Sequence, residues 1–109
     1  MKRVMTTEVP IDISPRDWVD VLNILREQVP GLEVWAFGSR ARRAAKPYSD
    51  LDLALMTPQP LTLAQLAAIT DAFETSNLSI RVDVVDWAAT SEAFRRIIER
   101  DRVVVQTAA

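Results

Sequence analysis

The sequence predicts an α/β (α+β) fold, with a small mixed β-sheet of three to four strands flanked by helices. Segments whose apolar residues recur at helical spacing alternate with short runs of β-branched and aromatic residues. Proline and glycine mark the ends of several of these segments. Such an alternation is typical of helices that cover a sheet. The length of 109 residues predicts one domain, residues 1–109.

The first predicted helix lies within residues 14–31. Ser14 is the expected N-cap, and Pro15 occupies the first helical position, where proline is favoured. Pro30 and Gly31 end the helix. The apolar residues at helical spacing are Trp18, Val21, Leu22, Leu25 and Val29.

Strands are predicted wherever β-branched and aromatic residues gather in a short run. The first such run ends at Gly38, and a short helix from Ser39 to about Ala45 is expected after it. The predicted strands are residues 32–39, 49–57, 79–87 and 102–106.

Two more helices are predicted, at residues 61–77 and 90–101. Thr62 and Gln65 form a T-x-x-Q capping box at the start of the first. The residues expected to face the core are Leu63, Leu66, Thr70 and Phe73 in the first helix, and Phe94, Ile97 and Ile98 in the second.

Composition excludes several kinds of chemistry. The chain has no cysteine and no histidine, so a thiolate site, a serine–histidine triad and the usual general base are all absent. A bound metal would be held by oxygen ligands, which favours Mg²⁺, Mn²⁺ or Ca²⁺. The net charge of −2 gives no general attraction to nucleic acid. No apolar run is long enough to cross a bilayer, and residues 1–10 hold no stretch of signal-peptide length, so we expect a cytoplasmic protein.

Two aspartates interrupt an otherwise apolar strand. Asp50 and Asp52 alternate with leucines, although aspartate is disfavoured in strands and an unpaired buried carboxylate is costly. Side chains two residues apart lie on one face of a strand. A divalent cation would turn the mutual repulsion of the two carboxylates into attraction. The alternative is an edge strand with a polar face, in which Asp50 is a turn residue.

A third aspartate stands in the next predicted strand, between valines. If the two strands are neighbours, Asp83 converges with Asp50 and Asp52. Asp86 lies on the opposite face from Asp83 and is expected to end or cap the strand.

A glycine-serine pair precedes the aspartates at the end of a strand. Gly38 and Ser39 fit either a tight turn or a backbone that approaches a phosphate closely. A basic block of Arg40, Arg42, Arg43 and Lys46 follows. Of these, Arg40 is the expected phosphate contact, whereas Arg42 and Arg43 fit a solvated face equally well.

Together, the G-S pair, the ten residues after it, D-L-D and the later aspartate resemble nucleotidyltransferases of the DNA polymerase β superfamily. The resemblance is greatest to the minimal nucleotidyltransferases (MNT) that are paired with HEPN-domain proteins in toxin–antitoxin modules. It covers residues 32–105, with "GSRARR" and "VDVVDW" also similar. One departure is Arg43, which stands where these proteins often have glycine.

The resemblance implies a fold, a reaction and a partner. Gly38 and Ser39, with Arg40, would bind the triphosphate of ATP, and Asp50, Asp52 and Asp83 would be the catalytic residues and the ligands of Mg²⁺ or Mn²⁺. The implied reaction transfers AMP to a hydroxyl, expected to be a tyrosine of a HEPN toxin, and so silences that toxin in a hetero-oligomer. Two alternatives stay open: an antitoxin that acts by contact alone, and nucleotidyl transfer to RNA, which the pI of about 5.1 disfavours.

Overall fold

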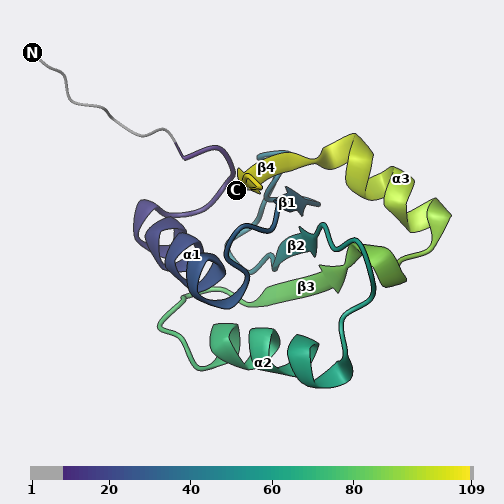
Figure 1. Ribbon diagram of the computed structural model, residues 1–109. Helices are drawn as coiled ribbons and strands as arrows, with labels where there is room; N and C mark the ends of the chain where they lie inside the picture. Colours follow the sequence, from purple (N-terminus) through teal and green to yellow (C-terminus); the bar gives the residue numbers. More distant parts are fainter. Residues whose placement is uncertain (1–8, 109) are drawn as a thin grey trace, which may run out of the picture.

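The computed structural model describes residues 9–108, which form one four-stranded sheet with helices on both faces (Figure 1). Residues 1–8, which include most of the segment searched for a signal peptide, lie outside the described part. The elements in chain order are α1 (Pro15–Gln28), β1 (Val34–Phe37), β2 (Leu51–Leu55), α2 (Leu63–Glu74), β3 (Val82–Asp86), a 3₁₀ turn η1 (Trp87–Ala89), α3 (Glu92–Asp101) and β4 (Val103–Gln106). The predicted fold class is confirmed.

The strands lie in the order β3-β2-β1-β4. β1 is antiparallel to both of its neighbours, whereas β2 and β3 are parallel. The parallel pair is joined by a crossover through α2, as parallel neighbours require. This topology makes β2 and β3 start at the same edge of the sheet, so that the first residues of both strands lie side by side.

Strand alternation gives the sheet two different faces. One face carries Leu51, Leu53 and Leu55, and it packs against α1 and α2 in the larger apolar core. The other face carries Ala54 and packs with Ile98 of α3 in a smaller cluster. Figure 1 shows this division, with α1 and α2 on one side of the strands and α3 on the other.

The helix starts lie where the capping residues predict them. The Asp17 backbone N–H donates to the Ser14 side chain at 3.1 Å, which caps α1. The Thr62–Gln65 capping box is complete, with both reciprocal hydrogen bonds formed. These caps satisfy N–H groups that have no partner within their own helix.

The short helix predicted from Ser39 to about Ala45 is wrong, because the segment makes a single hydrogen-bonded turn. The Ala44 N–H donates to the Ser39 carbonyl at 2.8 Å, and the Arg43 N–H to that of Arg40 at 3.4 Å. This pair of bonds is a Schellman motif, which ends a helix with a residue of positive φ. Arg43 is that residue, with φ of 56°. The left-handed backbone explains why glycine is favoured at this position, where this chain has arginine.

Three residues expected to face the core are exposed to different degrees instead. Leu63 is 88% exposed, because α2 rests on the sheet through Ile69 and Phe73. In α3, Ile98 is buried but Phe94 and Ile97 are partly open to solvent. α2 is apolar around much of its circumference, so tertiary packing decides which side of it is covered. Within residues 9–108, no helix has the length and apolar character needed to cross a membrane.

Candidate active site

Two of the three predicted carboxylates lie directly opposite each other. Asp52 of β2 is paired in register with Asp83 of β3, one residue after each strand begins. Asp52 alternates with the buried Leu51 and Leu53, so its side chain lies on the face of the sheet where α3 packs. Asp50 comes immediately before β2 rather than inside it. The convergence expected from the sequence therefore holds for the Asp52–Asp83 pair, and Asp50 joins it from the loop.

The proximity of these carboxylates affects the pKa of Asp52. Partial burial, and then the charges of Asp83 and Asp50, raise the pKa of Asp52 to about 6 from its ordinary value of 3.8. The negative charge of Asp83 is only partly compensated, by an ion pair at 3.7 Å with the exposed side chain of Arg81. The three carboxylates thus make a cluster of negative charge, which a nearby cation would stabilise.

Gly38 lies against this cluster. Its φ is +80°, and a Cβ built on it would stand 2.5 Å from the Oδ2 atom of Asp52. The pairing of Phe37 with Asp52 across β1 and β2 produces this contact, since Gly38 is the next residue after β1. The glycine is therefore required at this position both by its backbone conformation and by the side chain that it faces.

Ser39 and Arg40 follow Gly38 but have different environments. Ser39 is half-buried in the turn beside Gly38, where it remains a candidate for a phosphate contact. Arg40 is buried, and its guanidinium donates to backbone carbonyls of the surrounding loops. Those acceptors are Asp12 at 2.7 Å, Ser49 at 2.8 Å, and Lys46 and Pro47 at 3.4 Å. The sequence predicted that Arg40 contacts a phosphate. In the structure its side chain instead holds together the loop before β2.

Asp86 has a structural role at the far end of β3. Its carboxylate is buried and accepts hydrogen bonds from the Thr57 hydroxyl and, at 2.7 Å, from the Leu61 N–H. These bonds fix the segment that leads from β2 to α2. The position of Asp86 at the strand end agrees with the expectation from the sequence.

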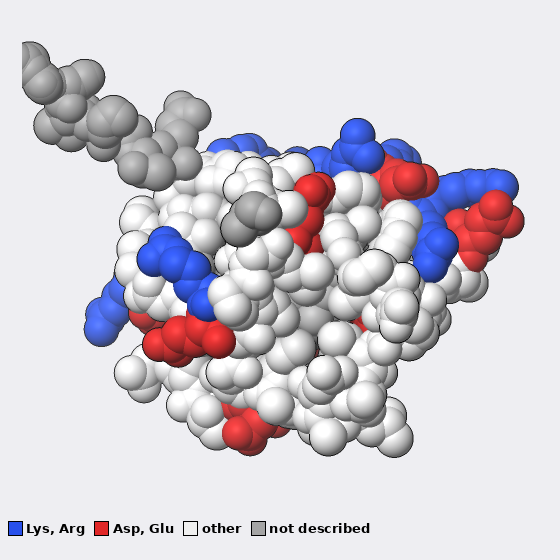
Figure 2. All heavy atoms as spheres, viewed as in Figure 1, with Lys and Arg blue, Asp and Glu red and all other residues white. Residues whose placement is uncertain are grey.

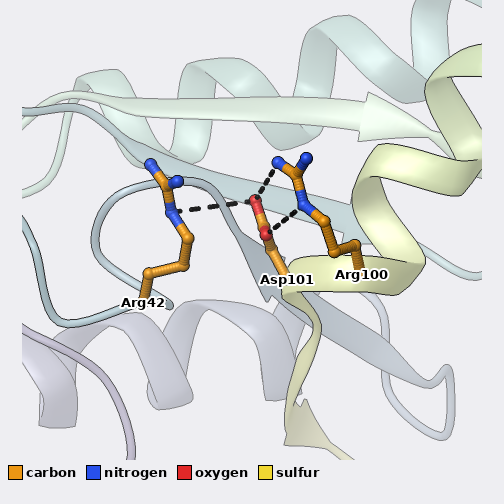
Figure 3. Close-up of polar contacts among 3 residues, drawn as sticks. All are labelled: Arg42, Arg100 and Asp101. Atoms are coloured by element: carbon orange, nitrogen blue, oxygen red, sulfur yellow. Dashed lines mark hydrogen bonds and ion pairs between the residues drawn. The ribbon is translucent and has the colours of Figure 1, made fainter.

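One residue near the site was missed by the sequence analysis. Asp101, the last residue of α3, is buried and accepts hydrogen bonds from Arg100 at 3.0 and 3.4 Å (Figure 3). The Arg42 Nε atom lies 3.9 Å from the same carboxylate. The only signal in the sequence was an aspartate among arginines, which is typical of a solvated helix end.

The site suits a cation that shares its ligands with a substrate. Residues 9–108 contain no group of three or more histidine, cysteine, aspartate or glutamate side chains arranged to hold a metal ion by themselves. Mg²⁺ does not need such a cage, because it is usually bound by one or two carboxylates together with water and substrate phosphates. Asp52 and Asp83 can supply that share. A cation between them would offset both the burial and the carboxylate repulsion that raise the pKa of Asp52.

A pH-dependent gain in stability is expected when Asp52 is neutralised. Because its folded pKa of about 6 is above 3.8, the folded state binds the proton more tightly, and the wild type loses stability as pH rises between these values. In EDTA, Asp52→Asn should raise the free energy of unfolding by about 1–2 kcal/mol at pH 7.5, after allowance for solvent screening. The gain should disappear near pH 4. Urea unfolding at both pH values measures it, and an equal gain at both would contradict the electrostatic origin.

A strand-paired set of carboxylates beside a glycine-serine turn, on one face of a small mixed sheet, is the arrangement of a nucleotidyltransferase. Residues 19–108 match the family model described as Polymerase beta, Nucleotidyltransferase, so the chain belongs to this family. The resemblance found in the sequence is thereby confirmed.

Among individual relatives, the chain is 46% identical over 102 residues to a Haemophilus influenzae protein named Probable protein adenylyltransferase MntA. The match covers 94% of this chain and 90% of the relative. The fold is also similar to that of a solved toxin–antitoxin complex with AMP-PNP, with a TM-score of 0.70 and 21% identity over 84% of this chain and 73% of that chain.

A further solved structure contains tri-AMPylated Shewanella oneidensis HEPN toxin in complex with MNT antitoxin. Its TM-score to this chain is 0.63, with 17% identity over 85% of this chain and 71% of that chain. At these identities, the two solved structures establish a shared fold.

Proposed function

We propose that this protein transfers AMP from ATP to a tyrosine hydroxyl of a HEPN-domain toxin, releases pyrophosphate, and so acts as the antitoxin. The relative named a probable protein adenylyltransferase and the complex with a tri-AMPylated HEPN toxin support this proposal. We also propose that residues 1–109 act as one domain in a hetero-oligomer with the toxin. The reaction is assigned to the cytoplasm, where ATP is supplied.

The observation that carries the proposal is the contact between the glycine-serine turn and a carboxylate pair. Gly38 lies directly against Asp52, and Asp52 faces Asp83 on the neighbouring strand. A triphosphate at the turn would therefore have its reacting phosphorus close to both carboxylates. A protein that only bound its partner would gain nothing from a carboxylate whose pKa is raised by burial and by two neighbouring carboxylates.

The chemistry forms one bond and breaks one. The acceptor oxygen bonds to the α-phosphorus of ATP, the bond from that phosphorus to the bridging oxygen of the β-phosphate breaks, and pyrophosphate leaves with the electron pair. We assign Gly38 and Ser39 to the triphosphate, and Asp50, Asp52 and Asp83 to Mg²⁺ or Mn²⁺. The bound cation would neutralise charge on the phosphates. Asp83 is the proposed acceptor of the hydroxyl proton, since the chain has no histidine.

The proposed reaction has a direct test. The purified protein is incubated with ATP, Mg²⁺ and a HEPN-domain partner, and the intact mass of the partner is measured. The mass should rise by one or more AMP units, and EDTA should prevent the rise because carboxylates alone cannot stabilise charge on the phosphate. Absence of any added mass, together with protection of cells from the toxin, would leave the contact-only antitoxin as the explanation.

The face in Figure 2 bears on the RNA alternative. Most of that face is uncharged, and basic and acidic side chains are interspersed at its edges. A protein that modifies RNA would benefit from a continuous basic track along the backbone of the nucleic acid. This face offers none.

Metal binding should be measurable without any partner. Mg²⁺ or Mn²⁺ should raise the melting temperature, and a nonhydrolysable ATP analogue should increase the shift, because each ligand binds the folded state. Asp52→Asn should abolish the shift while leaving the protein folded. Differential scanning fluorimetry with and without EDTA measures both effects. A shift of equal size in the variant would remove Asp52 from the metal site.

A further inference from the structure

Asp101 is a carboxylate in an unfavourable position. It is the last residue of α3, where the negative end of the helix dipole opposes a negative charge. Its side chain is only 4% exposed, and a buried carboxylate is costly unless it is paired. A residue that served only to end a helix would not need a charge at this place.

The partners of Asp101 come from two different segments. Arg100 from its own helix donates at 3.0 Å, and Arg42 from the turn after β1 lies 3.9 Å away (Figure 3). The backbone N–H of Gly38 also lies close to this carboxylate. The hydrogen bond from Arg100, and then the charge of Arg42 and the Gly38 N–H, hold the pKa of Asp101 below its ordinary value although burial opposes this. The carboxylate therefore joins the C-terminal end of α3 to the glycine-serine turn.

This link fixes the glycine that touches the carboxylate pair. The Gly38 N–H lies close enough to the Asp101 carboxylate to lower its pKa, and the Gly38 carbonyl accepts a hydrogen bond from the Arg42 N–H at 3.1 Å. On the side where other residues have a Cβ, Gly38 faces Asp52. Gly38 is thus held between two carboxylates, of which one belongs to the site and the other does not.

We propose that Asp101 is a positioning residue, which fixes the turn of residues 38–44 against Asp52 and thereby sets the affinity of the protein for ATP. It does so through the Gly38 N–H and the Arg42 guanidinium, without touching the nucleotide. The nucleotide part of this inference rests on the proposed function, whereas the fixing of the turn does not.

The test compares Asp101→Ala and Asp101→Asn with Arg96→Ala. Arg96 pairs with Glu92 at 3.9 Å on the exposed side of α3, so its removal breaks an ion pair of the same helix away from the turn. Amide hydrogen exchange of residues 39–44 reports the turn, titration with a fluorescent ATP analogue reports affinity, and thermal unfolding reports the fold. The partner-modification assay separates KM for ATP from kcat.

In Asp101→Ala, exchange in the turn and the dissociation constant of the ATP analogue should each rise about tenfold, and KM should rise more than kcat falls. Asp101→Asn keeps an oxygen acceptor for Gly38, so its values should lie between those of Asp101→Ala and the wild type. Arg96→Ala should match the wild type.

Unchanged exchange in folded Asp101→Ala or Asp101→Asn overturns the proposal, and so does faster exchange with unchanged affinity. If the wild type bound no ATP, the proposed function would fail, while exchange would still decide whether Asp101 fixes the turn.

Discussion

Replacement of Asp50 and Asp52 by alanine should reduce AMP transfer to the partner by about 10³-fold or more, without unfolding the protein. The double variant leaves Asp83 as the only carboxylate of the proposed set. One carboxylate cannot hold a cation between the two strands and also accept the proton of the acceptor. In cells, the variant should lose most of its protection against the toxin.

The electrostatics of the site separate lost chemistry from lost folding. Burial, and then the charges of Asp83 and Asp50, raise the pKa of Asp52 to about 6, so removing its charge is expected to favour the folded state at neutral pH. Activity and stability should thus change in opposite directions. Intact-mass analysis of the partner measures the first, and urea unfolding measures the second.

A matched control removes two acidic side chains elsewhere. Asp71→Ala/Glu74→Ala changes the net charge equally, on the exposed side of α2. It should keep full AMP transfer. Both double variants should still bind the partner in a pull-down, because the contact surface need not include the carboxylates. Full protection by Asp50→Ala/Asp52→Ala, with no mass added by the wild type, would overturn the enzymatic proposal.

The sequence predicted those features that depend on neighbouring residues. Ser14 and the Thr62–Gln65 pair mark helix starts because a cap acts over three residues. The Asp52–Asp83 pair could be predicted because an aspartate in an apolar strand is costly enough to require a reason. Its convergence depended on β2 and β3 being neighbours, which the observed register confirms.

Features that depend on distant segments could not be predicted in this way. Arg40 donates to a carbonyl 28 positions away, at Asp12, so nothing near it in the sequence indicated that its guanidinium is used inside the protein. Asp101 is close to Gly38 only because α3 returns across the sheet. Leu63 is exposed because α2 has apolar residues on several sides, and contacts with the sheet select Ile69 and Phe73.

A Cβ at Gly38 should disable the site by displacing Asp52. In Gly38→Ala, the new carbon would stand 2.5 Å from the Asp52 Oδ2 atom, so either the turn or the carboxylate must move. A misplacement of about 1 Å at a reacting centre can cost about 10²-fold in rate, and we expect a loss of this size in kcat/KM. Gly38→Val should lose at least as much, and its affinity for ATP should fall by more than its stability.

Gly31→Ala is the matched control, because both glycines have positive φ, +80° at Gly38 and +77° at Gly31. Each alanine therefore carries the same backbone penalty of about 1–2 kcal/mol, but only the one at Gly38 meets Asp52. Both variants should melt at lower temperature, and only Gly38→Ala should lose ATP binding in a titration with the fluorescent analogue. Shortening the opposing side chain, in Gly38→Ala/Asp52→Ser, should recover stability without recovering activity. Equal ATP affinity in folded Gly38→Ala and the wild type would mean that the glycine serves the turn alone, and that the phosphates of ATP are bound elsewhere.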